Sequence, residues 1–172
     1  MMLSNEDIKR CLADGSIKIE PKLPEDAIGP ASVDLTLSSE FWKFKNSING
    51  STVDLKQKTF KDVTERMVAD SVTLKPGDMI LGRTEEKITL PADIMGRLEG
   101  RSSFARMGLA IHVSSAVIQP GSSNHQVLEI VNLSPFTILL HKGLRVCQTL
   151  FERLETPTSK PYAKFGKVAR DQ

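Results

Sequence analysis

The feature that most constrains the fold is a series of short apolar segments separated by proline and glycine. Val33, Leu35 and Leu37 alternate with polar residues, as expected of a strand that buries one face. Further apolar segments lie at 17–19, 72–74, 79–81, 88–90, 111–113, 127–131 and 138–140, with turn residues at Pro76-Gly77, Pro91, Pro120-Gly121, Pro135 and Lys142-Gly143. Many short strands with little helix predict a mainly β fold, a distorted antiparallel β-barrel or jelly roll.

Two short helices are expected against this background. Ser4 can cap the first, Asp7 stands where a capping-box acid reaches back, and Gly15 follows its end. The run Ser-Ser-Phe-Ala-Arg-Met at 102–107 can form one or two helical turns closed by Gly108.

The overall composition favours one ordinary globular domain over residues 1–172, with the basic segment 160–172 as a flexible C-terminal tail. A net charge of +2 argues against a nucleic-acid coat, and no apolar run is long enough to span a membrane. The charged N-terminus lacks a signal-peptide core, which indicates a cytoplasmic protein. Cys11 and Cys147 fit reduced core residues better than a disulfide framework.

The segment at 100–106 has the residue types of an anion-binding turn. Gly100 and Arg101 precede Ser102 and Ser103 at a predicted helix start, where free backbone N–H groups and hydroxyls can meet a phosphate. Arg106 lies four residues after Ser102 and so shares its helical face, which would let two arginines grip a polyphosphate. An ordinary capped helix with solvated arginines fits the same spacing. The glycine-rich Walker pattern is absent.

Glu129 is the second candidate, because in a strand it shares a face with Val127 and Val131. A carboxylate on an apolar face costs free energy unless it is paired or used, so Glu129 is either a proton-shuttling base or an edge-strand acid that points at water or an arginine. The three histidines show no metal-ligand spacing. The H-x-E and P-C-x-x-C signature of zinc deaminases is also missing, since the sequence has no C-x-x-C.

The chain resembles the dCTP deaminases of the trimeric dUTPase superfamily. The resemblance rests on the string GRSSFARMGL at 100–109, followed at the family's distance by VLE at 127–129. The segments at 2–8, 28–37, 77–82 and 90–91 follow in the family's order, so the similarity covers most of the length. It implies a dUTPase-like fold and a homotrimer with active sites between subunits.

The resemblance also implies an activity, the zinc-independent hydrolytic deamination of dCTP to dUTP and ammonia, which supplies dUTP for thymidylate synthesis. Glu129 would be the general base for a water that attacks C4 of cytosine, Ser102 and the backbone around Ser115 would hold that water, and Arg106 would polarise the site. The implied triphosphate-binding residues are Arg101, Ser102, Ser103, Phe104, Ala105 and Arg106, with Mg²⁺ bound through the phosphates. Further implied nucleotide contacts are Gln119, Val127, Leu128 and Glu129, and Tyr162, Lys164 and Phe165 in the closing tail.

Three departures from the family pattern leave other functions open. Gln119 replaces the usual aspartate before Pro120-Gly121, and glutamine can hydrogen-bond a sugar but cannot act as a base. Ser122 replaces a bulky aromatic residue, which loosens the expected packing on the sugar, and Val168 replaces a glutamine in a shortened tail. The alternatives are therefore a diphosphatase for dUTP or another pyrimidine triphosphate, a bifunctional deaminase-diphosphatase, and a non-catalytic nucleotide-binding relative.

Overall fold

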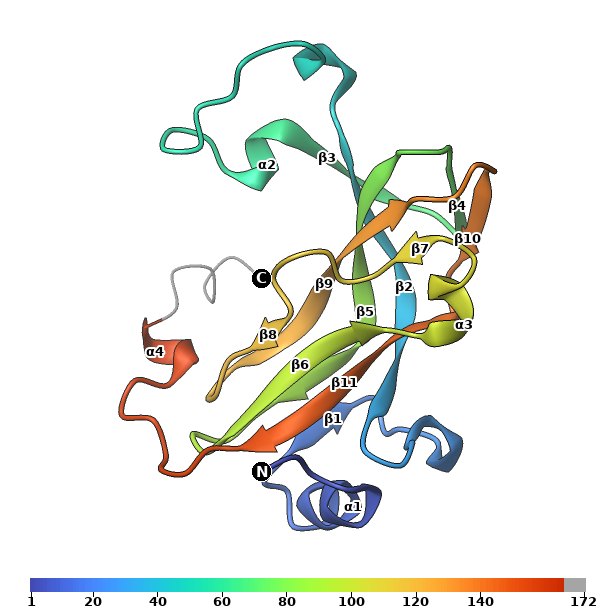
Figure 1. Ribbon diagram of the computed structural model, residues 1–172. Helices are drawn as coiled ribbons and strands as arrows, with labels where there is room; N and C mark the ends of the chain where they lie inside the picture. The colour runs from blue at the N-terminus through green and yellow to red at the C-terminus, as the bar shows by residue number, and fades with distance from the viewer. Residues whose placement is uncertain (166–172) are drawn as a thin grey trace.

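The computed structural model describes residues 1–165 and is built mainly from antiparallel strands (Figure 1). The strands are β1 (Lys18–Glu20), β2 (Val33–Phe44), β3 (Thr64–Val68), β4 (Ser71–Leu74), β5 (Met79–Thr89), β6 (Ile94–Gly100), β7 (Leu109–Ala110), β8 (Val117–Ile118), β9 (Ser123–Asn132), β10 (Ile138–His141) and β11 (Arg145–Arg153). The helices are α1 (Asn5–Ala13), α2 (Phe60–Val63), α3 (Ser102–Ala105) and α4 (Tyr162–Phe165), with 3₁₀ turns η1 (Glu25–Ala27) and η2 (Asn46–Ile48). The expected mainly β fold with short helices near both predicted positions is confirmed.

One curled sheet runs in the order β7-β9-β5-β2-β11-β6-β8, with β1 paired to β5 and β3 paired to β2. A separate two-stranded sheet joins β10 to β4. In the β5–β9 ladder, Leu81 lies opposite Glu129 and Arg83 opposite Val127. The sheet therefore brings the strand of the candidate acid against a strand that lies almost fifty residues earlier in the chain.

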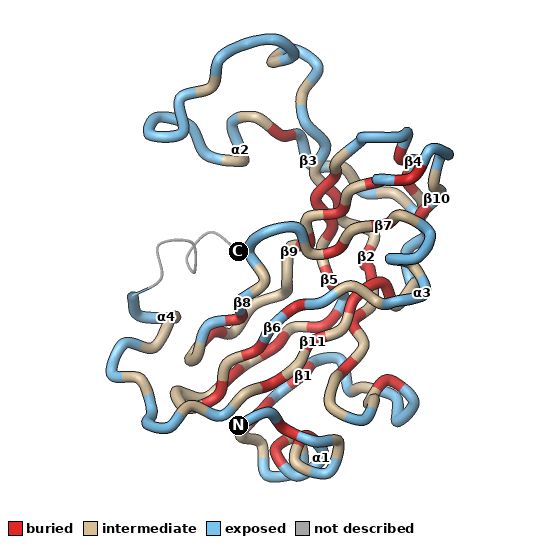
Figure 2. The backbone as a smooth tube through the Cα atoms, viewed as in Figure 1, coloured by how far each residue is buried: buried red, intermediate tan, exposed pale blue. Residues whose placement is uncertain are grey.

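The core follows the alternation of the sequence. Val33, Leu35, Leu37 and Phe41 of β2 are fully buried, as are Leu128 and Ile130 of β9, and Figure 2 shows buried residues concentrated along the sheet. The N-terminal capping box is present, since Asp7 accepts hydrogen bonds from the backbone N–H and hydroxyl of Ser4. Both cysteines are buried and free, and burial raises the pKa of the Cys147 thiol.

Between β2 and β3 the chain leaves the sheet as an exposed arm, residues 45–63, at the top of Figures 1 and 2. The arm ends in α2, where the Asp62 carboxylate accepts hydrogen bonds from the N–H and hydroxyl of Thr59. The ring of Phe60 packs edge-on against Trp42, with centroids 6.4 Å apart. These contacts fix the end of the arm above the sheet.

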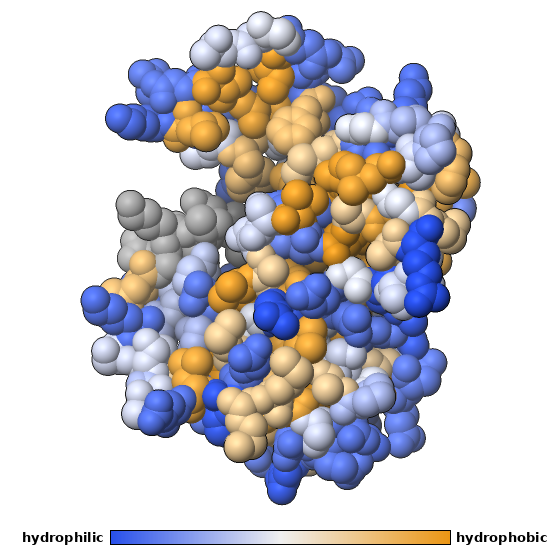
Figure 3. All heavy atoms as spheres, viewed as in Figure 1, coloured by the Kyte–Doolittle hydropathy of each residue, from blue (hydrophilic) through white to orange (hydrophobic). Residues whose placement is uncertain are grey.

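A group of exposed apolar side chains lies beside α3. Leu133 donates its backbone N–H to the carbonyl of Gly108 just after α3, and Met107, Leu133, Phe136 and Leu139 are each about half exposed or more. Figure 3 shows apolar atoms gathered where β9 ends beside β7. Such a patch is typical of a protein–protein contact. Within residues 1–165, no helix has the length and apolar character needed to cross a membrane.

Candidate active site

Glu129 lies in the wall of a cavity of about 560 Å³. The loop 112–119 supplies one side of this cavity, β9 another, and α2 and α4 contribute one aromatic residue each. The lining residues are Phe60, Leu81, Leu98, His112, Ser114, Ser115, Ala116, Val117, Ile118, Gln119, Ser122, Asn124, Gln126, Val127, Glu129 and Tyr162. The cavity therefore joins segments that are spread over a hundred residues of sequence.

The Glu129 carboxylate is held in one orientation by Ser114. The backbone N–H of Ser114 donates to Oε2 at 2.7 Å, and its hydroxyl lies 3.1 and 3.2 Å from the two carboxylate oxygens. The Glu129 side chain is 20% exposed, so it keeps contact with the cavity. These hydrogen bonds fix the plane of the carboxylate in the cavity wall.

His112 contacts the same glutamate from the other side. Its Nδ1 accepts the backbone N–H of Glu129 at 3.1 Å, and its Nε2 lies 3.8 Å from Oε1 of Glu129. Burial lowers the pKa of the ring below 6.5, while the Glu129 carboxylate and the Ser115 backbone oppose that shift. The ring is therefore uncharged at neutral pH.

The C-terminal segment closes one end of the cavity. The backbone N–H of Tyr162 donates to the carbonyl of Pro120 at 2.9 Å, and that of Ala163 donates to the carbonyl of Gly121 at 3.2 Å. Gly121 has φ +74°, and a Cβ on it would lie 2.5 Å from the Cβ of Pro161. The turn thus needs glycine both for its backbone conformation and for the docking of this segment.

We expect Gly121→Ala to release the C-terminal segment, whereas Gly143→Ala should not. Both glycines have positive φ and share a backbone strain of about 1–2 kcal/mol on substitution, but only Gly121 has an atom within 4 Å of the added methyl group. Limited proteolysis should cleave Gly121→Ala faster near residue 160. Its KM for nucleotide should rise about tenfold, equivalent to about 1.4 kcal/mol of lost binding. Equal proteolysis of both variants would contradict this account.

The predicted anion-binding turn lies elsewhere in the same chain. None of residues 101–106 lines the cavity, and Figure 1 shows α3 and α4 on opposite sides of the view. Ser102, Ser103 and Arg106 are exposed. Arg101 forms an ion pair with Asp34 at 3.2 Å and donates to the carbonyl of Arg145 at 2.9 Å.

The remaining predicted residues divide between the cavity and its surroundings. Ser115, Gln119, Val127 and Tyr162 line the cavity with Glu129. Leu128 is fully buried and points into the core, because it alternates with its neighbours along β9. Lys164 is exposed, Phe165 lines an adjoining hollow with Gln119 and Tyr162, and Val168 lies outside the described residues.

The sequence interpretation missed several cavity residues, namely Phe60, His112, Ser114, Asn124 and Gln126. Ser114 and His112 lie close to Ser115 and could have been found by extending that segment. Phe60 gave no local signal, because only the folded arm brings it to the cavity.

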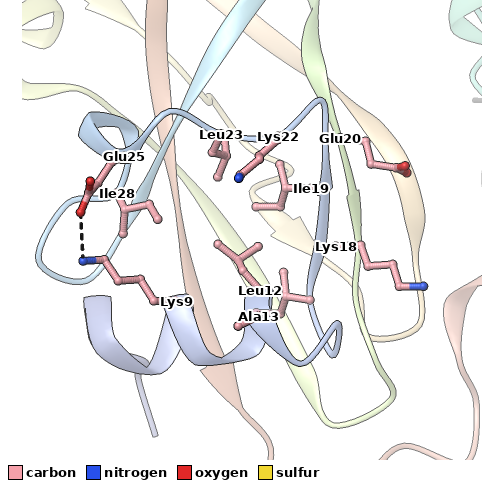
Figure 4. Close-up of a pocket in the computed structure, with 11 residues that line it drawn as sticks. Lys9, Leu12, Ala13, Lys18, Ile19, Glu20, Lys22, Leu23, Glu25 and Ile28 are labelled. Carbon is pink, nitrogen blue, oxygen red and sulfur yellow. Dashed lines mark ion pairs between the residues drawn. The ribbon is translucent and has the colours of Figure 1, made fainter.

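A larger hollow of about 940 Å³ lies between α1, β1 and residues 20–28 (Figure 4). Figure 4 shows Leu12, Ile19, Leu23 and Ile28 directed into it, with Lys9 and Glu25 paired at 3.7 Å on its edge. None of the sequence-predicted site residues lines this hollow. The predicted catalytic residues lie instead in the cavity around Glu129 and in the separate turn at 101–106.

Comparisons with known proteins agree on one family. A family model described as dCTP deaminase-like matches residues 2–154. The chain is 41% identical to the dCTP deaminase of Rhodospirillum rubrum, over 95% of this chain and 88% of that protein. It is 39% identical to a protein of Methanopyrus kandleri named dCTP deaminase, dUMP-forming, over 99% of this chain and 92% of that protein.

Solved structures show the same fold. The 2′-deoxycytidine 5′-triphosphate deaminase of Agrobacterium tumefaciens matches 89% of this chain with a TM-score of 0.67 and 25% identity, and this chain spans 47% of that longer chain. A dUTPase from phage phi11 of S. aureus matches 88% of this chain and 99% of its own, with a TM-score of 0.55 and 15% identity. The expected dUTPase-like fold is thereby confirmed.

Proposed function

Because this chain belongs to the dCTP deaminase-like family, we propose that it catalyses the hydrolytic deamination of dCTP to dUTP and ammonia. The observation that carries the proposal is the Glu129 carboxylate, oriented by Ser114 in the wall of a cavity beside Ser115. A fixed carboxylate next to backbone polar groups is suited to activate a bound water.

The reaction follows from this arrangement. The backbone around Ser115 helps to hold a water, Glu129 takes a proton from it, and the water oxygen bonds to C4 of cytosine while the electron pair of the C4=N3 double bond moves to N3. Glu129 then returns the proton to the C4 amino group, the electron pair on N3 re-forms the double bond to C4, the bond from C4 to the amino nitrogen breaks, and ammonia leaves. The oxygen remains on C4 and its proton passes to N3, so the product base is uracil. The cavity residues Gln119, Val127 and Tyr162 contact the sugar and the base.

The triphosphate needs cationic groups, and within residues 1–165 no lysine or arginine lines the cavity. We assign it to residues 101–106 of a neighbouring subunit, because α3 lies away from the cavity of its own chain and Ser102, Ser103 and Arg106 are exposed there. The apolar patch of Met107, Leu133, Phe136 and Leu139 beside α3 gives such a neighbour a surface to pack on. We therefore propose a homotrimer with active sites between subunits.

In this reaction Mg²⁺ binds through the phosphates of the nucleotide and not through protein side chains. Among residues 1–165, no three His, Cys, Asp or Glu side chains are grouped to hold a metal ion. Mg²⁺ commonly keeps several waters and binds through substrate phosphates, and here it would neutralise charge on the triphosphate. We further propose that the chain is one nucleotide-binding domain and acts in the cytoplasm.

The product distinguishes the proposed activity from its alternatives. We expect ammonia and dUTP from dCTP, with little dUMP or pyrophosphate, because Gln119 cannot act as a base for cleavage of the triphosphate. The relatives include proteins named dCTP deaminase and others named dUMP-forming, so the product identifies which of the two activities this chain has. The measurement is an analysis of the products formed from dCTP, CTP, dUTP and dCMP in the presence of Mg²⁺.

The other outcomes each select an alternative function. Ammonia together with dUMP would indicate a bifunctional enzyme, and pyrophosphate without ammonia would indicate a diphosphatase. Calorimetric binding of dCTP with no product after hours would indicate a non-catalytic relative. Turnover of CTP as fast as of dCTP would show that Ser122 leaves room for a ribose.

A further inference from the structure

His112 presents one ring nitrogen to the backbone of Glu129 and the other to its carboxylate. Nδ1 accepts the N–H of Glu129, so Nδ1 carries a lone pair. The ring is uncharged at neutral pH, and its single proton therefore resides on Nε2. The contacts of the fold thus select one tautomer and direct a hydrogen-bond donor toward the candidate base.

That donor makes no hydrogen bond within residues 1–165, although the Ser115 backbone acts on the same ring. Nε2 is buried without a hydrogen bond, and the whole side chain is 3% exposed. The nearest carboxylate oxygen, Oε1 of Glu129, lies at 3.8 Å, which is beyond hydrogen-bond range. A buried donor without an acceptor is unfavourable, so a shift of Oε1 by about 1 Å toward Nε2 would be favoured.

We propose that His112 is a positioning residue for Glu129, which makes this inference rest on the proposed function. When nucleotide fills the cavity, the carboxylate moves toward His112 and Nε2–H donates to Oε1. Ser114 N–H already holds Oε2. Two donors from two sides then fix the plane of the carboxylate and aim its remaining lone pairs at the attacking water.

A purely structural role would use only Nδ1, which ties the loop at 112 to β9. Two substitutions separate the two roles. In His112→Asn the side-chain oxygen can occupy the position of Nδ1 and accept the Glu129 N–H, but nothing reaches Oε1. In His112→Gln the amide nitrogen can occupy the position of Nε2 and donate to Oε1.

We expect His112→Asn to keep the thermal midpoint of the parent but to lose about 10- to 100-fold in kcat, the usual effect of losing a partner that orients a reactive group. His112→Gln should recover kcat to at least about tenfold above the Asn variant, with KM similar in both. A kcat for His112→Asn equal to that of the parent would overturn the positioning role. Equal losses in the two variants would overturn it as well.

A second measurement does not depend on activity. Long-range ¹H–¹⁵N spectra of the full chain, with the His112 signals identified by their loss in His112→Asn, should show the proton on Nε2 and a lone pair on Nδ1. A proton on Nδ1 would overturn the inference whatever the activity. Absence of ammonia release from the parent would instead refute the proposed deaminase, and the positioning role with it.

Discussion

Replacing Glu129 with glutamine is expected to lower kcat for dCTP deamination by about 10³-fold, within the range usual for loss of a general base. The amide matches the carboxylate in shape, and its oxygen can still accept the Ser114 N–H. It cannot take a proton from water, so the chemical step fails while binding survives. Ammonia release measures the first effect, and calorimetric titration with dCTP should show an affinity within about threefold of the parent.

The matched control is Glu65→Gln, which removes the same charge from an exposed position on β3 outside the cavity. It should deaminate dCTP at the rate of the parent. Equal ammonia release by the parent and Glu129→Gln would remove Glu129 from the reaction. A loss of thermal stability confined to Glu129→Gln would instead indicate that the carboxylate serves the fold.

Residues whose role depends on local pattern could be predicted from the sequence. The capping box of Ser4 and Asp7 and the alternation along β2 and β9 involve neighbours a few residues apart. The same alternation placed Val127 and Glu129 together on the face that lines the cavity. Alternation alone also set Leu128 on the opposite face, although the resemblance had suggested a nucleotide contact for it.

The missed residues depend on contacts that no local pattern encodes. Phe60 reaches the cavity only because the arm 45–63 folds back and its ring packs on Trp42. In the sequence His112 is one of three histidines with no shared spacing. Its role depends on a contact with Glu129, seventeen residues later, which only the folded chain makes. The need for glycine at position 100 also depends on a contact that the sequence does not show. A Cβ there would lie 2.5 Å from the carbonyl oxygen of Ile111.

Arg106→Ala is expected to lower kcat/KM by about 10²- to 10³-fold, because it removes a cation assigned to charge on the bound nucleotide. Arg106 is exposed and lines no part of the cavity in its own chain, so the loss should not be accompanied by unfolding. The control is Lys164→Ala, an exposed cation of α4, for which a smaller effect on KM is expected. Steady-state kinetics with dCTP distinguishes the two variants.

Mixing the two inactive chains tests whether one subunit supplies Arg106 to the Glu129 of another. Arg106→Ala retains Glu129, and Glu129→Gln retains Arg106. If the site lies between subunits, unfolding and refolding an equal mixture should restore activity in about one quarter of the sites, those with an intact residue on each side. If both residues serve a site within one chain, every site in the mixture keeps a defect and activity stays at the level of the separate variants. Recovery of ammonia release only after joint refolding is therefore the expected result, because residues 101–106 do not line the cavity around Glu129 in the single chain.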